Sequence, residues 1–247
     1  YKITIYDRHD RIGGLLMYGI PNFKLEKEIV IRRTKRLIKS GIKFKLNCNI
    51  GKNISFKEIR KKHDVVLIST GTYKAKKTSI DTQGLKKIIP ALEYLIASNK
   101  KNLGDYVEKF SSGELNAKGK KVVVIGCGDT AMDCVRTAVR QGAASVKCLY
   151  RRNRDNIPGS QREVSNAMEE GVNFYWLTLP TKYLSKDNVE SINVLNTQLG
   201  MPDETGRVTV NIKKGREKKI NSDMVIEAIG FDAEDLRKHF NSHLLSL

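Results

Sequence analysis

Apolar and polar positions follow one another along the chain in blocks that are typical of an α/β protein. Residues 122–125 are apolar at every position, as in a parallel strand that is buried on both faces. Residues 130–141 then repeat apolar side chains at helical spacing, and Gly142 provides a suitable end for this helix. A second strand is predicted over residues 146–150. Together these segments predict one β–α–β unit.

The same patterns predict elements on both sides of this unit. Residues 65–69 form an apolar run that predicts a buried strand, followed by a turn of small residues at Thr70 and Gly71. The run 224–229 repeats that arrangement. After residue 177, several short strands separated by turn residues predict a small antiparallel β-layer. The remaining predictions are strands over 2–6 and 43–46 and helices over 26–40, 55–62, 90–98 and 161–170. The helix over 55–62 begins with Ser55 and Glu58 at capping-box spacing.

The turn inside the β–α–β unit fits the dinucleotide fingerprint G-x-G-x-x-G/A, with Gly126, Gly128 and Ala131 at the three small positions. Gly126 allows a tight turn, Gly128 lets the backbone approach a diphosphate, and Ala131 lets the helix pack close to the strand. A diphosphate at the start of this helix would meet unpaired amide N–H groups and the positive end of the helix dipole. The turn therefore predicts a dinucleotide site.

Two arginines close the second strand of the unit. An NAD site usually has an acidic residue there for the ribose 2′-hydroxyl, whereas an NADP site accommodates the 2′-phosphate with arginine. This chain has Arg151 and Arg152, with Arg154 close by and no carboxylate before Asp155. Guanidinium groups match phosphate oxygens in a bidentate manner. Solvated arginines are the alternative interpretation, but the order of strand, glycine turn, helix, strand and arginines favours an NADP(H) site.

Asp7 closes the first predicted strand, at a position where dinucleotide folds bind the adenosine ribose. No glycine-rich turn precedes it in the sequence, so two interpretations stay open. Asp7 is an ordinary carboxylate at a strand end, or the chain starts partway into a nucleotide-binding domain. The loop 11–25 favours the second interpretation, because its Gly13-Gly14 pair would allow the backbone to run close to a flat ligand.

Composition is that of a soluble globular protein with one large or two modest domains: 247 residues, 40% hydrophobic and 29% charged. A net charge of +18 would by itself suit a nucleic-acid binder. The lysines, however, are dispersed without stacking aromatic residues between them, so we interpret them as solvated and expect no nucleic-acid partner. An acidic protein partner stays open. The dispersed lysines are Lys24, Lys27, Lys35, Lys39, Lys57, Lys61, Lys62, Lys86 and Lys87.

Neither a membrane nor a metal site is expected from the sequence. No apolar run approaches the roughly 20 residues that a bilayer span requires, and no signal peptide is recognised at the start. The four cysteines show no C-x-x-C spacing, so they predict neither a metal nor an iron–sulfur site. Cysteines of this kind are typical of a reducing compartment, and we expect a cytoplasmic location. The cysteines are Cys48, Cys127, Cys134 and Cys148.

Five segments carry a family resemblance: GGLLMYGIPNFKLEK (13–27), VVVIGCGDTAMDCVRTAVRQGA (122–143), YRRNRDNIPGSQREV (150–164), EEGVNF (169–174) and GFDAEDL (230–236). In this order they resemble the small (β) subunit of bacterial NADPH-dependent glutamate synthase. The related FAD/NADPH domains of dihydropyrimidine dehydrogenase share the resemblance, which extends over nearly the whole chain. It implies an α/β fold, in which a Rossmann-like NADPH-binding domain is inserted in a partial FAD-binding dinucleotide domain.

The resemblance also implies a division of the chain. Residues 1–103 are expected to form the partial FAD-binding domain. Residues 104–230 are expected to form the NADPH-binding domain with its antiparallel β-layer, and residues 231–247 to begin the return to the FAD domain. The family's N-terminal cysteines, its first FAD fingerprint and its C-terminal FAD segment are missing. The chain is therefore expected to be a fragment with an incomplete FAD site that binds FAD weakly or not at all.

By resemblance, the chain is an NADPH-dependent flavoprotein oxidoreductase that serves as the electron-entry subunit of glutamate synthase. Hydride passes from NADPH to FAD, and electrons continue through iron–sulfur clusters, expected only outside this chain. They reach a large (α) subunit that makes glutamate from glutamine and 2-oxoglutarate. Hydride transfer needs no catalytic side chain, because the protein aligns and tunes the two cofactors.

The resemblance assigns cofactor-binding positions to both halves of the chain. For FAD they are Asp7 at the ribose, Gly13, Gly14 and Leu15 beside the cofactor, and Thr70 and Gly71 on the first small-residue turn. For NADPH they are Gly126, Gly128, Asp129, Thr130 and Ala131 at the diphosphate, Arg151 and Arg152 at the 2′-phosphate, and Ala228 and Gly230 on the second small-residue turn.

Two alternatives stay open. The first is a related FAD/NADPH electron-transfer module of the ferredoxin–NADP reductase or dihydropyrimidine dehydrogenase type, with a different electron acceptor. The second is a non-catalytic fragment that uses its basic surface to bind an acidic protein or RNA. RNA binding that weakens steeply with salt, without affinity for nucleotides, would support the second alternative.

Overall fold

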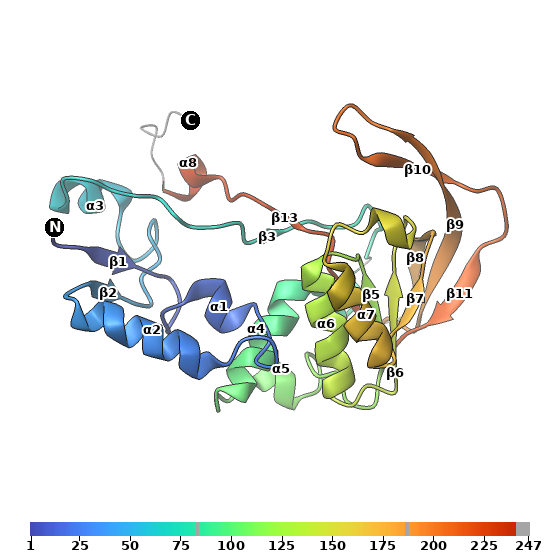
Figure 1. Ribbon diagram of the computed structural model, residues 1–247, viewed down its shortest axis with the longest axis horizontal. Coiled ribbons are helices and arrows are strands. Elements are labelled where there is room, and N and C mark those ends of the chain that lie inside the picture. The colour runs from blue at the N-terminus through green and yellow to red at the C-terminus, as the bar shows by residue number, and fades with distance from the viewer. Residues whose placement is uncertain (83, 186–187, 241–247) are drawn as a thin grey trace. The chain divides into compact units, whose positions relative to one another are not determined.

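The computed structural model describes residues 1–82, 84–185 and 188–240 of the chain. It consists of two compact units (Figure 1). Of the described residues, the first unit contains 1–74 and 231–240, and the second contains those within 75–230. Part of the predicted return segment, residues 241–247, lies outside the described residues.

A five-stranded parallel sheet of order β4-β12-β5-β6-β7 forms the centre of the second unit. Side chains alternate across it as the pleat requires. Val122 and Val124 join the core on the helix side of β5, whereas Val123 and Ile125 join the core on the opposite side. Burial on both faces explains the continuous apolar run. The strands are β4 (Ile88–Pro90), β5 (Lys121–Ile125), β6 (Ser145–Leu149), β7 (Asn173–Tyr175) and β12 (Met224–Glu227).

Helices pack on one face of this sheet, and α6 contacts both β5 and β6. Ala131 is fully buried, so α6 lies close to the strands as the small side chain predicts. The helix ends next to Gly142, whose positive φ of +81° is suited to glycine. The helices of this unit are α4 (Ala91–Asn102), α5 (Glu108–Ser111), α6 (Asp129–Arg140) and α7 (Gln161–Glu169), with a short 3₁₀ helix η1 (Arg154–Asn156).

A four-stranded antiparallel sheet packs on the opposite face, through Tyr183, Ile192 and Val194. The second unit thus has three layers: helices, parallel sheet and antiparallel sheet (Figure 1). Because β4 and α4 belong to these layers, the predicted boundary between residues 103 and 104 falls inside the unit. The antiparallel strands are β8 (Thr178–Leu184), β9 (Ser191–Pro202), β10 (Val208–Ile212) and β11 (Lys218–Asn221).

The first unit is smaller, and most of the buried hydrophobic side chains of the described residues belong to the second unit. Strands β1 and β2 pair in parallel, and β3 pairs with β13. Helix α3 begins with the predicted capping box, in which Ser55 Oγ accepts the Glu58 N–H and the Glu58 carboxylate accepts the Ser55 N–H. The elements are β1 (Thr4–Tyr6), α1 (Gly14–Tyr18), α2 (Lys27–Lys39), β2 (Lys43–Lys45), α3 (Phe56–Lys62), β3 (Lys74–Ala75), β13 (Phe231–Asp232) and α8 (Leu236–His239).

Two predictions for this unit are wrong. Residues 65–69 do not form a buried strand, and Val65 and Leu67 are 84% and 87% exposed. Among the described residues no strand pairs with this run, and an apolar run cannot form a strand of a parallel sheet without neighbours. Lys27 is not solvated but 1% exposed. Its Nζ donates to the carbonyls of Leu16 and Ile20 at 3.0 and 2.5 Å, where the end of α1 leaves acceptors without helical partners.

None of the helices within the described ranges combines the length and hydropathy that a membrane span requires.

Candidate functional site

The turn after β5 runs directly against the second small-residue turn. Gly126 has a φ of +120°, and a Cβ at this position would lie 2.2 Å from the carbonyl oxygen of Ala228. The Gly126 N–H donates to the Leu149 carbonyl at 3.0 Å, and the Ala228 N–H donates to the Ile125 carbonyl at 2.8 Å. Both the conformation and the close approach require glycine here. The structure therefore brings the two predicted turns together at the carboxyl ends of β5 and β12.

Gly128 is different, because the protein itself does not require glycine at this position. It is the N-cap of α6 with φ −86° and ψ 179°, a conformation open to any residue. A Cβ would find Pro158 Cγ at 3.9 Å as its nearest neighbour, which is ordinary contact. Where no protein atom would exclude a larger side chain, a glycine is expected if a ligand approaches the backbone at that position. This position fits a diphosphate at the start of α6.

The loop before α7 borders the same turn, and sequence reasoning did not include it in the site. Asp129 Oδ1 accepts the Ser160 N–H at 3.0 Å. A Cβ on Gly159 would lie 3.0 Å from the Asp129 nitrogen. Asp129 is thus exposed but engaged with this loop, while Thr130 is half-buried and Ala131 is buried. The Pro-Gly dipeptide at 158–159 predicts a turn, but it gives no signal that this turn lies beside residues 126–131.

Arg151 and Arg152 follow β6 but have different environments. The Arg151 side chain is exposed, while its carbonyl accepts the Thr197 hydroxyl at 2.7 Å. Arg152 is 8% exposed, and its Nε donates to the Val208 carbonyl at 2.7 Å. Within the described part of the chain, Arg152 forms no ion pair. A buried guanidinium without an anion is unfavourable, so this position suits a negative group supplied by a ligand.

The second small-residue turn follows a hydrogen-bonded cluster around one half-buried carboxylate. Glu227 Oε1 accepts the hydroxyls of Thr78 and Tyr183, each at 2.7 Å. Burial, together with the Glu227 carboxylate, raises the pKa of Tyr183, so its hydroxyl stays protonated and can donate. Ala228 is buried, and Gly230 has a φ of +102° with its carbonyl accepting the Lys76 N–H at 3.0 Å. The cluster links β12 to β8 and fixes the turn beside Gly126.

In the first unit, Asp7 is engaged within the chain. Its Oδ1 accepts both the backbone N–H and Nδ1 of His9 at 2.9 Å. Burial acts to raise the pKa of Asp7, but the hydrogen bonds and charge of His9 outweigh it, so the pKa is lowered. The carboxylate is therefore ionised at neutral pH. Its assignment to the FAD ribose stays a prediction.

The glycine positions predicted beside FAD have reasons inside the protein. A Cβ on Gly13, whose φ is +123°, would lie 2.8 Å from Val30 Cγ1. Gly14 has a φ of +50° and Leu15 is exposed on α1. Because packing alone explains Gly13, the first unit gives no independent support for a flavin, and these assignments stay predictions.

The predicted first small-residue turn follows the run 65–69, which is not a strand. Thr70 is exposed and outside regular secondary structure, and Gly71 has a φ of +71° beside the Tyr73 ring. The structure does not place these two residues at a strand end. Their assignment to FAD also stays a prediction.

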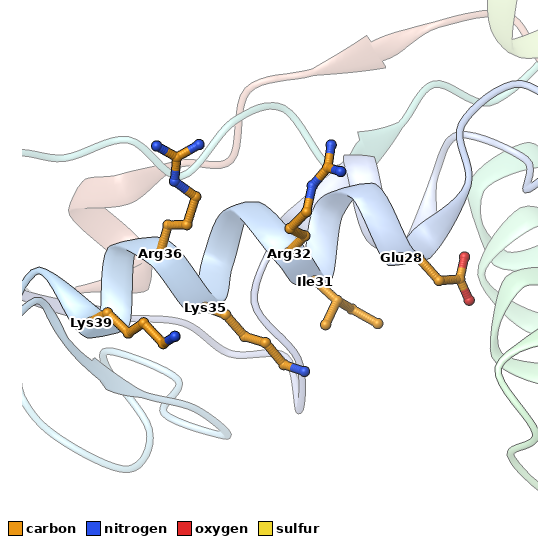
Figure 2. A pocket seen from close by; sticks show the side chains of 6 residues that line it. All are labelled: Glu28, Ile31, Arg32, Lys35, Arg36 and Lys39. Carbon is orange, nitrogen blue, oxygen red and sulfur yellow. The ribbon is translucent and has the colours of Figure 1, made fainter.

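A hollow of about 510 Å³ runs along the exposed face of α2 in the first unit. Figure 2 shows Arg32 and Arg36 extending from one side of the helix and Lys35 and Lys39 from the other. The lining residues are Glu28, Ile31, Arg32, Lys35, Arg36 and Lys39, and no predicted cofactor position is among them. In the ranges the structure describes, no group of three or more His, Cys, Asp or Glu side chains is arranged to hold a metal ion.

Comparison with known proteins gives consistent matches. The family model described as pyridine nucleotide-disulphide oxidoreductase matches residues 52–243. The chain is 52% identical over 241 residues to the glutamate synthase (NADPH) small chain of Azospirillum brasilense, covering 98% of this chain and 50% of that protein. It is 42% identical over 243 residues to the glutamate synthase (NADPH) small chain of Escherichia coli K12, covering 96% and 51%. The chain thus spans about half the length of the curated relatives it matches.

Among solved structures, FprA of Mycobacterium tuberculosis in complex with NADPH matches with a TM-score of 0.77 at 16% identity. The match covers 92% of this chain and 63% of FprA. At this identity the likeness shows the fold alone. It confirms the predicted α/β class with dinucleotide-type domains.

Proposed function

Because the chain belongs to the pyridine nucleotide-disulphide oxidoreductase family, we propose that it carries the NADPH-binding part of a glutamate synthase small chain. The observation that carries this proposal is Arg152, a buried guanidinium without an ion pair in the described residues, at the end of the strand after the fingerprint turn. A 2′-phosphate would supply the missing anion. NAD has no such group.

The chain's own residues would bind and orient the dinucleotide. The turn 126–131 would hold the diphosphate, Arg151 and Arg152 the 2′-phosphate, and the adjoining turn 228–230 would border the site. When bound, NADPH supplies a hydride. No side chain of this site has to act as a nucleophile or proton carrier for that chemistry.

The rest of the pathway is part of the same proposal and is supported by the likeness to the two small chains. It comprises FAD as hydride acceptor, iron–sulfur clusters outside this sequence and a large (α) subunit that makes glutamate in the cytoplasm. The large subunit as electron acceptor is tested by measuring NADPH oxidation in its presence. The oxidation should depend on glutamine and 2-oxoglutarate. Oxidation with ferredoxin instead would favour the related electron-transfer modules.

The NADPH site itself is tested by Gly128→Ala. We expect the unfolding temperature to stay within about 2 °C and the Kd for NADPH to rise at least about tenfold. The added methyl group meets no protein atom closer than 3.9 Å, but it would occupy the space of the diphosphate. Titration calorimetry with NADPH gives the affinity. The absence of NADPH binding by the unaltered chain would overturn the proposal, and equal affinity in the variant would overturn the diphosphate assignment.

A second function is favoured by the α2 hollow: docking of an acidic polypeptide. Residues 1–74 contain 18 of the 45 Lys and Arg residues but only six of the 27 Asp and Glu residues. The hollow lies between two rows of cations, and Ile31 adds an apolar side chain to its lining. Helix α2 has no aromatic side chain on which a base could stack, so charge complementarity favours an acidic protein over RNA.

Charge reversal of the four cations that line the hollow tests this second function. Replacement of Arg32, Lys35, Arg36 and Lys39 by Glu should weaken binding of poly-L-glutamate about tenfold or more at low salt, since each exposed pair contributes about 0.2–1 kcal/mol. The matched control reverses the four exposed cations of α3 and should change binding less than about threefold, because net charge alone is a weaker determinant. The control residues are Lys57, Arg60, Lys61 and Lys62.

Two outcomes would contradict the docking surface. Equal losses in the α2 and α3 variants would show that net charge alone determines binding. Tighter binding of single-stranded RNA than of poly-L-glutamate, lost in the α2 variant, would assign the surface to nucleic acid instead.

A further inference from the structure

Three consecutive carbonyl groups at the end of β6 are each held by a donor from outside that strand. The carbonyls on either side of Arg151 accept the N–H groups of Thr178 and Leu177, at 2.9 and 3.0 Å. The Arg151 carbonyl accepts the Thr197 hydroxyl at 2.7 Å. Two of these donors are backbone groups that any sequence would supply. The hydroxyl of Thr197 is the side-chain donor of the set.

The Thr197 hydroxyl fixes a peptide plane that both arginines share. The Arg151 carbonyl belongs to the peptide bond between Arg151 and Arg152, and that group is planar. Its orientation therefore sets the directions in which both side chains leave the backbone. Thr197 is 3% exposed on β9, so water does not compete for the bond.

The surrounding backbone makes Thr197 a rigid support. Its own N–H donates to the Leu177 carbonyl at 2.8 Å. Leu177 has a φ of +50°, a left-handed conformation that is unfavourable in a residue other than glycine and persists where neighbours hold it. The neighbouring strand β10 supplies the Val208 carbonyl to Arg152 Nε at 2.7 Å. The antiparallel layer thus orients both arginines, one through its backbone and one through its side chain.

We propose that Thr197 is a positioning residue for cofactor choice: its hydroxyl orients the Arg151–Arg152 peptide so that the two guanidinium groups converge on the 2′-phosphate. The inference rests on the proposed NADPH site. Thr197 does not contact the cofactor and acts through the arginines. Its loss should therefore affect ligands that carry a 2′-phosphate and leave other adenine nucleotides nearly unchanged.

The test compares 2′,5′-ADP, which carries the extra phosphate, with 5′-ADP, which lacks it, by titration calorimetry on the 247-residue chain. Thr197→Val removes the hydroxyl at nearly constant shape and leaves the Arg151 carbonyl without its donor. We expect the Kd of 2′,5′-ADP to rise about 5- to 10-fold and that of 5′-ADP to change less than about twofold. Thr197→Ser, which keeps the hydroxyl, should restore the 2′,5′-ADP affinity.

A matched control is available in the same antiparallel sheet. Thr181 Oγ1 lies 2.6 Å from Glu217 Oε1 and 3.2 Å from the Asn193 carbonyl oxygen, and neither acceptor belongs to an arginine. Thr181→Val should leave the ratio of the two affinities unchanged. If Thr197→Val does not fold, Thr197→Ala against Thr197→Ser gives the same comparison of a missing and a retained hydroxyl.

Equal losses for both nucleotides in Thr197→Val, or the same loss in Thr197→Ser, would show a merely structural role and overturn the inference. Absence of 2′,5′-ADP binding by the unaltered chain would instead overturn the proposed NADPH site, on which the inference depends. The two failures are distinguishable, because a loss of affinity in the Thr197 variants can be measured only if the unaltered chain binds 2′,5′-ADP.

Discussion

Gly126→Ala is expected to lower the free energy of unfolding of the second unit by about 3 kcal/mol and to raise the Kd for NADPH at least about 100-fold. The added Cβ would lie 2.2 Å from the Ala228 oxygen and 2.8 Å from its carbonyl carbon. Both atoms are backbone, so no flexible side chain can move aside. The turn after β5 and the turn after β12 must separate, and the hydrogen bond from the Ala228 N–H to the Ile125 carbonyl, 2.8 Å long, must lengthen.

Urea denaturation and NADPH titration measure the two expected effects of Gly126→Ala. Gly142→Ala is the matched control, because Gly142 also has a positive φ, +81°, but no atom lies within 4 Å of the position its Cβ would take. It should cost only about 1 kcal/mol of backbone strain and leave NADPH binding unchanged. Similar losses of stability in both variants would show that strain, and not the approach of Ala228, makes Gly126 necessary.

Gly126→Ala and Gly128→Ala together separate the two roles of the fingerprint glycines. The first change should affect folding and binding, because the protein itself occupies the space. The second should affect binding alone, because no protein atom lies closer than 3.9 Å to the added methyl group. The fingerprint already assigns the tight turn to Gly126 and the approach to a diphosphate to Gly128, and the backbone around the two glycines gives the steric basis of that difference.

The β–α–β unit could be predicted from sequence because its information is local. A run of four apolar residues, two spaced glycines and one amphipathic helix specify strand, turn and helix without reference to distant residues. The capping box at Ser55 and Glu58 is local in the same sense, and the structure confirms it. These elements carry most of the predicted NADPH site.

Predictions failed where the outcome depends on distant partners. The run 65–69 has the composition of a strand, but a strand forms only beside another, and among the residues described none is paired with it. Its place on a basic helix predicts a solvated Lys27, but its ammonium group is buried because it donates to the carbonyls of Leu16 and Ile20. Thr197 gave no signal at all, because threonine is common in strands and its partner lies 46 residues away.

The paired arginines show the same limit within one dipeptide. The two side chains follow β6 directly but differ in burial, because Arg151 is exposed while Arg152 is buried against the Val208 carbonyl. The sequence predicts two equivalent phosphate ligands. The structure indicates an adaptable cation and a fixed one.

The double change Arg151→Ala with Arg152→Ala is expected to raise the Kd for NADPH about 100-fold and that for NADH less than about threefold. Each charge-assisted hydrogen bond to a phosphate contributes about 1.5–3 kcal/mol. NADH has no 2′-phosphate and forms no such bond, so removal of the arginines should change its affinity little. Titration calorimetry of both dinucleotides against the variant and the unaltered chain measures the two ratios. Equal weakening of NADPH and NADH would show that the pair does not read the 2′-phosphate.

The single variants should separate the adaptable cation from the fixed one. Arg151→Ala removes an exposed side chain, so the unfolding temperature should stay constant while NADPH binding weakens. Arg152→Ala also leaves the Val208 carbonyl without its donor, so the unfolding temperature should fall as well. In Arg152→Lys the charge is retained, but one ammonium group cannot serve both Val208 and a phosphate in the geometry of a guanidinium. Its NADPH affinity should therefore lie closer to that of Arg152→Ala than to that of the unaltered chain, and full affinity in this variant would show that charge alone selects the cofactor.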